Sequence, residues 1–191
     1  MATHVFSDSL EYEQSKFETN NRFYTEKLAA TNIERIKFEG KEGKTLQRND
    51  IDLYVTVDGK RISVSEKDRH RNFHDVLIEF YSKYPTVRGW MDHSKADILA
   101  YFVPGSVIWI NKVQLVGFYE NHLKSAVPDT FFDELIRSGK SIATKEIVLL
   151  DKKETITLVA ANNREYITAS VCVGLEVLKR AGVEYRIYIF R

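Results

Sequence analysis

The chain has 191 residues, of which 43 % are hydrophobic, and 28 Lys and Arg residues nearly balance 27 Asp and Glu residues, giving a formal net charge of +1. A chain of this length and hydrophobic content can bury a substantial core, which excludes an intrinsically disordered protein. The small net charge excludes a globally basic nucleic-acid coat protein but leaves a local basic cleft open.

Apolar runs and cysteines bear on where the protein resides. No apolar run approaches the ~20 residues that span a bilayer, so we expect no membrane insertion. The N-terminal residues lack the basic segment and apolar stretch of a secretory signal. Cys172 is the only cysteine and cannot form an intrachain disulfide, which fits a reducing compartment. Together these features predict a cytoplasmic protein.

The first elements in chain order are a long helix and a short strand. Apolar residues recur at helical spacing from Ser9 to Ala30, with Ser9 as a suitable N-cap, so a helix is predicted there. Residues 32–38 are predicted to form a strand, with Phe38 as one of its apolar positions. Residues 39–50, EGKEGKTLQRND, are rich in glycine and charge, and we predict a loop.

A β-hairpin follows, centred on Asp58–Gly59. Apolar and polar residues alternate on both sides of this turn dipeptide, over residues 51–57 and 61–67. A two-residue turn places Val57 opposite Lys60 and Leu53 opposite Val64. The alternation then puts the apolar side chains of the hairpin on one buried face.

The rest of the chain alternates between strands and helices. We predict strands over residues 96–103, 106–110, 142–150, 155–160, 166–174 and 185–191, and helices over residues 111–124, 131–138 and 175–180. This order favours a mixed α/β or α+β class. Pro128 is the best candidate for a boundary between a core, residues 1–127, and an extension packed on it, residues 128–191, although one domain over residues 1–191 stays open.

The solvent-side face of the hairpin carries the residues whose side chains can take part in catalysis. Asp52, Ser65 and Lys67 share this face in the predicted register, whereas Glu66 falls on the apolar side unless a bulge turns it over. Phosphodiester hydrolysis needs a hard divalent cation held by carboxylates and a positive charge near the attacking water. A solvated strand face carries Asp and Lys in many proteins, so the pattern alone leaves a purely structural role open.

These residues carry a family resemblance. The segment QRNDIDLYVTVDGKRISVSEK resembles the central motif of the PD-(D/E)XK nuclease superfamily, in which an aspartate opens one strand and an acidic-x-Lys triplet lies on the next. The segments EKDRHRNFHDVLIEFYS and RGWMDHSKADILAYF resemble nuclease-like proteins of this superfamily from phages and mobile elements. The resemblance implies a restriction-endonuclease-like core, in which helices flank a mixed central sheet, with C-terminal strand and helix additions.

The resemblance also implies a set of site residues. Asp52 is the first acid and Lys67 the lysine, but Ser65 occupies the slot that should be acidic. Some members of the superfamily carry Ser-x-Lys and take the second carboxylate from the following element, which makes Glu79 the preferred ligand and Glu66 the competing one. The implied activity is a Mg²⁺- or Mn²⁺-dependent nuclease, with DNA as the expected substrate.

Polar and basic residues beside the motif are candidate phosphate contacts. They are Gln47 and Arg48 before it, and Arg69, His70 and Arg71 after it. Two other functions stay open: a catalytically degenerate protein that binds nucleic acid, and a protein that binds another protein. The sequence also leaves a homodimer open, since many double-strand cutters act as symmetric pairs.

Overall fold

The hairpin predicted around Asp58–Gly59 is present as two adjacent strands of the first of two β-sheets. The computed structural model describes residues 6–37 and 40–190, with side chains from residue 16 onward. Strands β2 (Leu53–Val57) and β3 (Lys60–Asp68) are antiparallel, with Val57 opposite Lys60 and Leu53 opposite Val64, so the predicted register is confirmed. Asp58 and Gly59 both have positive φ, 49° and 73°, as a type I′ turn requires.

The first sheet is mixed, as the sequence analysis predicted. Its strand order is β1-β2-β3-β6-β7-β11. Neighbouring strands are antiparallel except β3 and β6, which are parallel. The bounds of the strands not yet given are β1 (Asn32–Arg35), β6 (Ile98–Val103), β7 (Ser106–Asn111) and β11 (Tyr185–Ile189).

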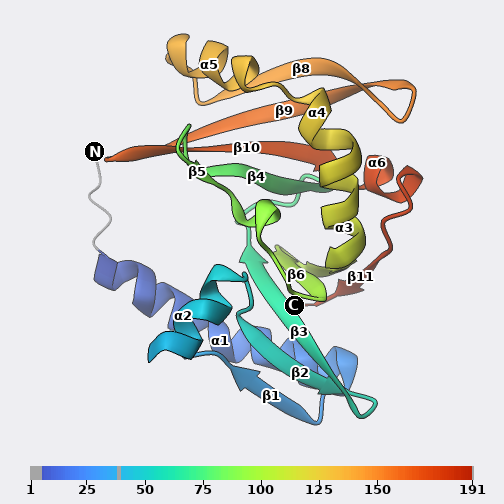
Figure 1. Cartoon of the computed structure of the whole chain (residues 1–191). Coiled ribbons are helices and arrows are strands. Elements are labelled where there is room, and N and C mark those ends of the chain that lie inside the picture. Colours follow the sequence, from blue (N-terminus) through green and yellow to red (C-terminus); the bar gives the residue numbers. More distant parts are fainter. Residues whose placement is uncertain (1–5, 38–39, 191) are drawn as a thin grey trace.

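One long helix, α1 (Phe6–Leu28), covers one face of this sheet (Figure 1). Phe23 and Tyr24 of the helix are fully buried against Leu53, Val55 and Val64 of the hairpin. The predicted N-terminal helix and the buried apolar face of the hairpin are therefore confirmed, but Ser9 is not the N-cap, because the helix already begins at Phe6. Phe38 and Arg191, predicted to lie in strands, fall outside the described residues, as does the side chain of Leu10 in the predicted helix.

A second, antiparallel sheet packs on the other side of the first one (Figure 1). Its strand order is β5-β4-β10-β9-β8. The bounds are β4 (Asp75–Lys83), β5 (Val87–Arg88), β8 (Ile142–Leu149), β9 (Lys152–Asn163) and β10 (Tyr166–Gly174). Strand β4 was not among the predicted elements, although Val76, Ile78 and Phe80 alternate along it and are buried. Strand β4 lies between β3 and β6 in the chain, so the polypeptide leaves the first sheet, enters the second and returns.

Short helices fill the connections between strands. Their bounds are η1, a 3₁₀ turn (Trp90–Asp92), α3 (Lys112–Phe118), η2, a π-helical turn (Tyr119–Leu123), α4 (Lys124–Ala126), α5 (Asp129–Arg137) and α6 (Leu175–Arg180). The helix predicted over residues 111–124 is present, continued by the π-helical turn. Among residues 6–37 and 40–190, no helix combines the length and the apolar character needed to cross a bilayer.

The prediction of a loop before the hairpin was wrong, because residues 40–48 form helix α2 (Gly40–Arg48). Its charged residues are exposed, whereas Gly43 is buried and Leu46 is partly buried. Packing of this narrow inner side overrides the weak helix propensity of the two glycines. The helix ends immediately before Asp50, so it fixes where the candidate site begins.

The segments before and after Pro128 are interleaved. Residues 129–174 supply α5 and three strands of the second sheet, while β11 near the C-terminus pairs with β7 in the first sheet. A single large cluster of buried apolar residues draws on both segments. The fold is thus a mixed α+β arrangement. Strand β3 of the first sheet, β4 of the second sheet and helix α3 come together where the two sheets pack.

Candidate functional site

The candidate site lies where β3, β4, η1 and α3 meet, at the end of α2. It contains three acids, two lysines, two serines and one tryptophan, which come from segments far apart in the sequence. These residues are Asp50, Asp52, Ser65, Lys67, Glu79, Trp90, Ser94 and Lys112. The crossing of the chain from β3 to β4 brings Lys67 and Glu79 onto facing sheets, near enough for their charges to affect each other's pKa.

Asp50 is bound by both lysines of the site. Its Oδ1 accepts a hydrogen bond from Lys67 Nζ at 2.7 Å, and its Oδ2 accepts one from Lys112 Nζ at 2.6 Å. Ser94 Oγ also donates to Oδ2, at 3.1 Å. Burial alone would raise the pKa of Asp50, but the two ammonium groups lower it to about 2. Asp50 is therefore ionised throughout the physiological range.

The backbone places the Asp50 side chain by a left-handed turn. The chain leaves α2 with Asp50 N–H donating to Gln47 O at 3.0 Å, and Asp50 has a φ of 55°. Aspartate adopts this conformation more readily than most residues, because its short polar side chain can bond locally. The turn directs the carboxylate inward, where its side chain is only 8 % exposed.

The two lysines differ in burial. The Lys112 side chain is 0 % exposed and its Nζ lies 4.1 Å from the centre of the Trp90 ring, whereas the Lys67 side chain is 29 % exposed. Burial lowers the pKa of Lys112 to about 8, although Asp50 opposes the shift. Burial also acts to lower the pKa of Lys67, but Asp50 and Asp52 outweigh it and raise the pKa. Lys67 is thus a stable ammonium that reaches solvent.

Asp52, the predicted first acid, lies beside Lys67 and forms no ion pair within the described part of the chain. Its Oδ2 accepts a hydrogen bond from the backbone N–H of Glu66 at 2.7 Å. Burial raises the pKa of Asp52, and the Lys67 charge and this hydrogen bond offset the rise only in part. Asp52 is a carboxylate whose charge is incompletely compensated.

Glu79, the predicted second ligand, reaches the same lysine from the other sheet. Burial raises its pKa, while Lys67 and a hydrogen bond from the Trp90 backbone oppose the rise and Asp50 adds to it. Lys67 is therefore near enough to Asp52 and to Glu79 for its charge to lower the pKa of each, while Asp52 and Glu79 as a pair of metal ligands stay a prediction. The direct partner of Lys67 is Asp50, which the sequence analysis did not select.

Glu66, the competing ligand, points to the opposite side of β3. Its two carboxylate oxygens accept hydrogen bonds from Arg35, at 2.7 and 3.1 Å, and from Tyr24 of α1, at 2.7 Å. The side-chain alternation predicted for β3 explains this placement. Its carboxylate is held by the helix side of the sheet, away from Glu79.

Ser65, in the slot that the family pattern fills with an acid, is 0 % exposed. Its Oγ is the one buried side-chain nitrogen or oxygen atom without a hydrogen-bond partner in the part of the chain whose side chains are described. A buried hydroxyl without a partner costs free energy, on the order of 1–3 kcal/mol. This hydroxyl lies between Ser63 and Lys67 on the face of β3 that carries the site.

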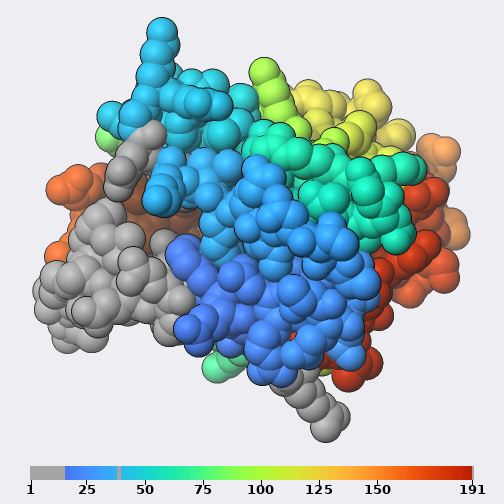
Figure 2. All heavy atoms as spheres, turned by 90° about the horizontal axis from the view of Figure 1, so that it is seen from below, coloured from blue at the N-terminus to red at the C-terminus, as the bar shows by residue number. Residues whose placement is uncertain are grey.

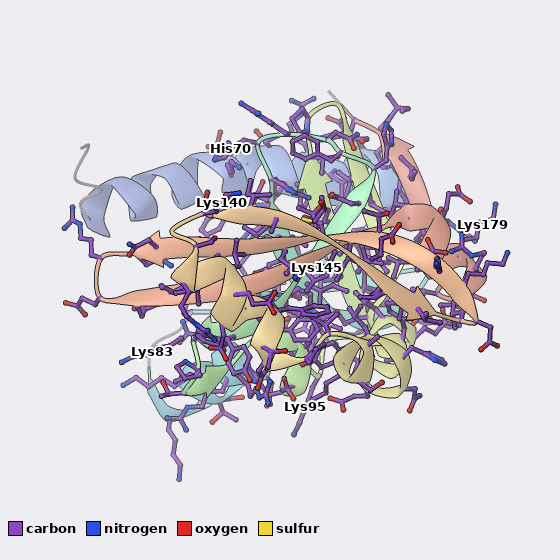
Figure 3. All side chains as sticks on the ribbon, turned by 90° about the horizontal axis from the view of Figure 1, so that it is seen from above. His70, Lys83, Lys95, Lys140, Lys145 and Lys179 are labelled. Carbon is purple, nitrogen blue, oxygen red and sulfur yellow. The ribbon has the colours of Figure 1, made fainter. Side chains whose placement is uncertain are left out.

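The predicted phosphate contacts fall into three groups. Arg69 forms an ion pair with Asp75 and lies 5.0 Å from the centre of the Phe73 ring, so it is tied into the loop after β3. His70 and Arg71 are exposed, and Figure 3 shows His70 at the edge of the molecule opposite Lys83 and Lys95. Gln47 and Arg48 are exposed on α2, next to the site.

One hollow in the described structure is lined by none of these site residues. It has a volume of about 880 Å³ and is lined by residues of β7, β11 and the end of α6, among them Trp109, Lys179 and Arg186. In the cluster around Asp50, by contrast, the side chains of Asp50 and Lys112 are buried against each other. Within residues 16–37 and 40–190, no three His, Cys, Asp or Glu side chains are already grouped closely enough to hold a metal ion.

Comparison with known proteins adds no assignment. No family model matches the chain, and neither a curated protein nor a solved structure matches it. The function must therefore be argued from the site itself.

Gly89 controls the position of Glu79, which leads to a first prediction. A Cβ at residue 89 would lie 2.1 Å from Glu79 O and 2.9 Å from Glu79 Cγ. Gly89→Ala must therefore move β4 away from η1, and we expect it to reduce the free energy of unfolding by about 2 kcal/mol. Chemical denaturation measures the change.

The matched control for Gly89→Ala is Gly117→Ala. Gly117 lies within α3, and a Cβ there has no atom within 4 Å. This substitution should stabilise the protein by about 0.5–1 kcal/mol, because alanine favours the helix. Equal stability of the two variants would contradict the close approach of Gly89 to Glu79.

Proposed function

We propose that this protein is a metal-dependent phosphodiesterase that cleaves nucleic acid, with DNA as the first substrate to test. The observation that carries the proposal is that the charge of Lys67 acts on two buried carboxylates, Asp52 just before β2 of the first sheet and Glu79 on β4 of the second. Burial raises the pKa of both carboxylates, so one lysine does not compensate their charge. A divalent cation between them would do so.

The donor set fits a hard cation. Asp52 and Glu79 would offer carboxylate oxygens, and the unpartnered Ser65 Oγ, two residues before Lys67 on the same face of β3, would offer a third oxygen. Mg²⁺ and Mn²⁺ prefer oxygen ligands and retain several waters. The bound metal would supply Lewis acidity toward the phosphate and a more acidic water. The resemblance to PD-(D/E)XK nucleases supports the same assignment, with Glu79 replacing the acid absent at Ser65.

Lys67 acts as a charged group in this proposal. Although burial opposes it, Asp50 and Asp52 raise the pKa of Lys67, which keeps the amine protonated at neutral pH. A protonated amine cannot accept a proton from water. Lys67 therefore orients the attacking water and stabilises negative charge that develops on the phosphate oxygens.

Asp50 and Lys112 are positioning residues for Lys67. Asp50 holds Lys67 Nζ at 2.7 Å, and Lys112 fixes the other oxygen of the same carboxylate at 2.6 Å. Lys112 is buried under Trp90, so substrate cannot displace it easily. The pair keeps the Lys67 ammonium in one place before substrate arrives.

Metal-dependent cleavage tests the proposal. The purified protein is expected to nick supercoiled plasmid or degrade a labelled oligonucleotide in Mg²⁺ or Mn²⁺, and to lose this activity in EDTA. An Asp52→Asn, Glu79→Gln double variant, prepared in the same way, should show no cleavage. Equal cleavage by this variant and the wild type would trace the activity to a contaminating nuclease and overturn the proposal.

A second candidate is a catalytically inactive protein that binds nucleic acid. Two observations favour it: Lys67 and Lys112 already neutralise Asp50, and no three metal-ligating side chains are grouped in the described part of the chain. This candidate predicts DNA binding that is sensitive to salt and independent of metal, without cleavage under any metal condition.

A further inference from the structure

Helix α2 carries a row of cations on its exposed side. Lys41, Lys44 and Arg48 are spaced by three and four residues, so they project from the same side of the helix, opposite the buried Gly43. All three are exposed. None of them forms an ion pair with a carboxylate among residues 16–37 and 40–190.

Lys95 extends this row toward the site. Its backbone N–H donates to Asn49 O at 2.8 Å, which places it beside the end of α2. The preceding residue, Ser94, hydrogen-bonds Asp50. Lys41, Lys44, Arg48 and Lys95 together form what we call the basic stripe. Figure 2 shows α2 projecting at the margin of the face that α1 and β1 form, and Figure 3 shows Lys95 pointing outward.

The stripe has the length of a short run of backbone phosphates. The seven residue-to-residue steps from Lys41 to Arg48 rise about 10 Å at ~1.5 Å per residue. A nucleic-acid strand carries one negative charge per ~3.4 Å of duplex axis, so about three phosphates span this distance. The chain as a whole has a net charge of only +1, which makes this local excess of positive charge distinctive.

We propose that the basic stripe binds the phosphate backbone of the strand that enters the candidate site, an inference that rests on the proposed function. Arg48 and Lys95 lie nearest to Asp50, and Lys41 lies farthest along the helix. A strand lying on α2 would reach Lys67 and Asp52 at the end of the helix. Such contacts position the scissile bond but carry no sequence information.

DNA binding by a charge variant tests this inference. The variant K41Q/K44Q/R48Q/K95Q is compared with K140Q/K152Q/K153Q/K179Q, which removes four exposed cations from α6 and from the region of β8 and β9. Both carry D52N and E79Q and are measured in EDTA, so that DNA stays intact. Fluorescence anisotropy measures binding to a labelled 20-base-pair duplex and to its single strand, from 50 to 200 mM salt.

We expect the stripe variant to bind at least about tenfold more weakly than the control at low salt. Its slope of log K against log salt concentration should be smaller by about one for each lost phosphate contact. Equal affinity and equal slopes in the two variants would overturn the inference. Thermal unfolding of both variants verifies that they remain folded.

The outcomes separate this inference from the proposed function. If the stripe variant loses DNA binding and the wild type never cleaves DNA, the basic stripe is supported as a phosphate-binding surface and the proposed nuclease activity is rejected. If the wild type cleaves DNA with metal and the stripe variant binds DNA as well as the control, the nuclease activity is supported and the role of the basic stripe is rejected. No binding of either DNA by any variant at 50 mM salt would reject the stripe.

Discussion

Replacing Lys67 with methionine is expected to slow DNA cleavage by at least about 100-fold, since removing one preorganised positive group from a transition state has an effect of this size. The variant should remain folded, because Asp50 retains Lys112 as its partner at 2.6 Å. The first-order rate of plasmid nicking at saturating Mg²⁺ measures the effect. Lys153→Met, which removes an exposed lysine of β9, is the matched control and should cleave at the wild-type rate.

The dependence of cleavage on metal concentration separates the roles of Lys67 and the two acids. Asp52→Asn and Glu79→Gln should each raise the metal concentration needed for half-maximal activity, because each removes a carboxylate ligand. Lys67→Met should lower the maximal rate and leave that concentration nearly unchanged. Glu146→Gln, an exposed carboxylate of β8, should change neither. A Lys67→Met protein that retains well over a hundredth of the wild-type rate would contradict the assigned role.

Much of the fold could be predicted because local chemistry specifies it. Asp58–Gly59 defines the hairpin turn, and alternation in β2 and β3 defines which side chains face α1. The same alternation predicts that Lys67 and Glu66 lie on opposite faces, as they do. Helix α2 was not predicted, because its two glycines and its charged residues are typical of a loop and Leu46 is its only apolar side chain.

The site could be predicted only in part. Asp50 was not recognised as the partner of Lys67, and Lys112, the most buried residue of the site's ion pairs, is remote from Asp50 in sequence. Asp50 stands two residues before Asp52, and only the left-handed turn after α2 reveals that it meets Lys67. Lys112 follows a strand that belongs to the same sheet, and its pattern in the sequence is that of an ordinary helix start. Its contact with Asp50, 62 residues away, exists only once β3, β6 and β7 have paired in the first sheet.

Asp50→Asn is expected to lower the free energy of unfolding at pH 7 by about 3–5 kcal/mol. The substitution removes the one negative charge that both Lys67 and Lys112 contact directly. Lys112 is 0 % exposed, so its ammonium would be left buried without a counter-ion, and removing one partner of a buried ion pair has a cost of this size. Urea denaturation monitored by tryptophan fluorescence measures it. A loss below about 1 kcal/mol would contradict the burial of a charged Lys112.

The dependence of stability on pH gives a signature that a simple packing defect would lack. The folded-state pKa of Asp50, about 2, lies below its ordinary value of 3.8, so its contribution is present above pH ~4 and is lost as the pH falls toward 2. Asp50→Asn should flatten this acid limb. Between the folded-state pKa of Lys112, about 8, and its ordinary value of 10.5, the unfolded chain binds more protons, so this group makes stability rise with pH. Without Asp50 this rise should begin at a lower pH.

The second substitution Lys112→Met should recover most of the stability lost in Asp50→Asn. Methionine fills a similar volume beneath Trp90 and brings no charge, and replacing a buried ion pair by apolar residues is often neutral or stabilising. Lys67 is 29 % exposed and can regain water when Asp50 is absent. The double variant should therefore unfold at a higher urea concentration than Asp50→Asn alone while cleaving DNA slowly, because Lys67 has lost the carboxylate that positions it. Recovery of stability without recovery of activity would assign Lys112 to balancing the charge of Asp50, and Asp50 to placing Lys67.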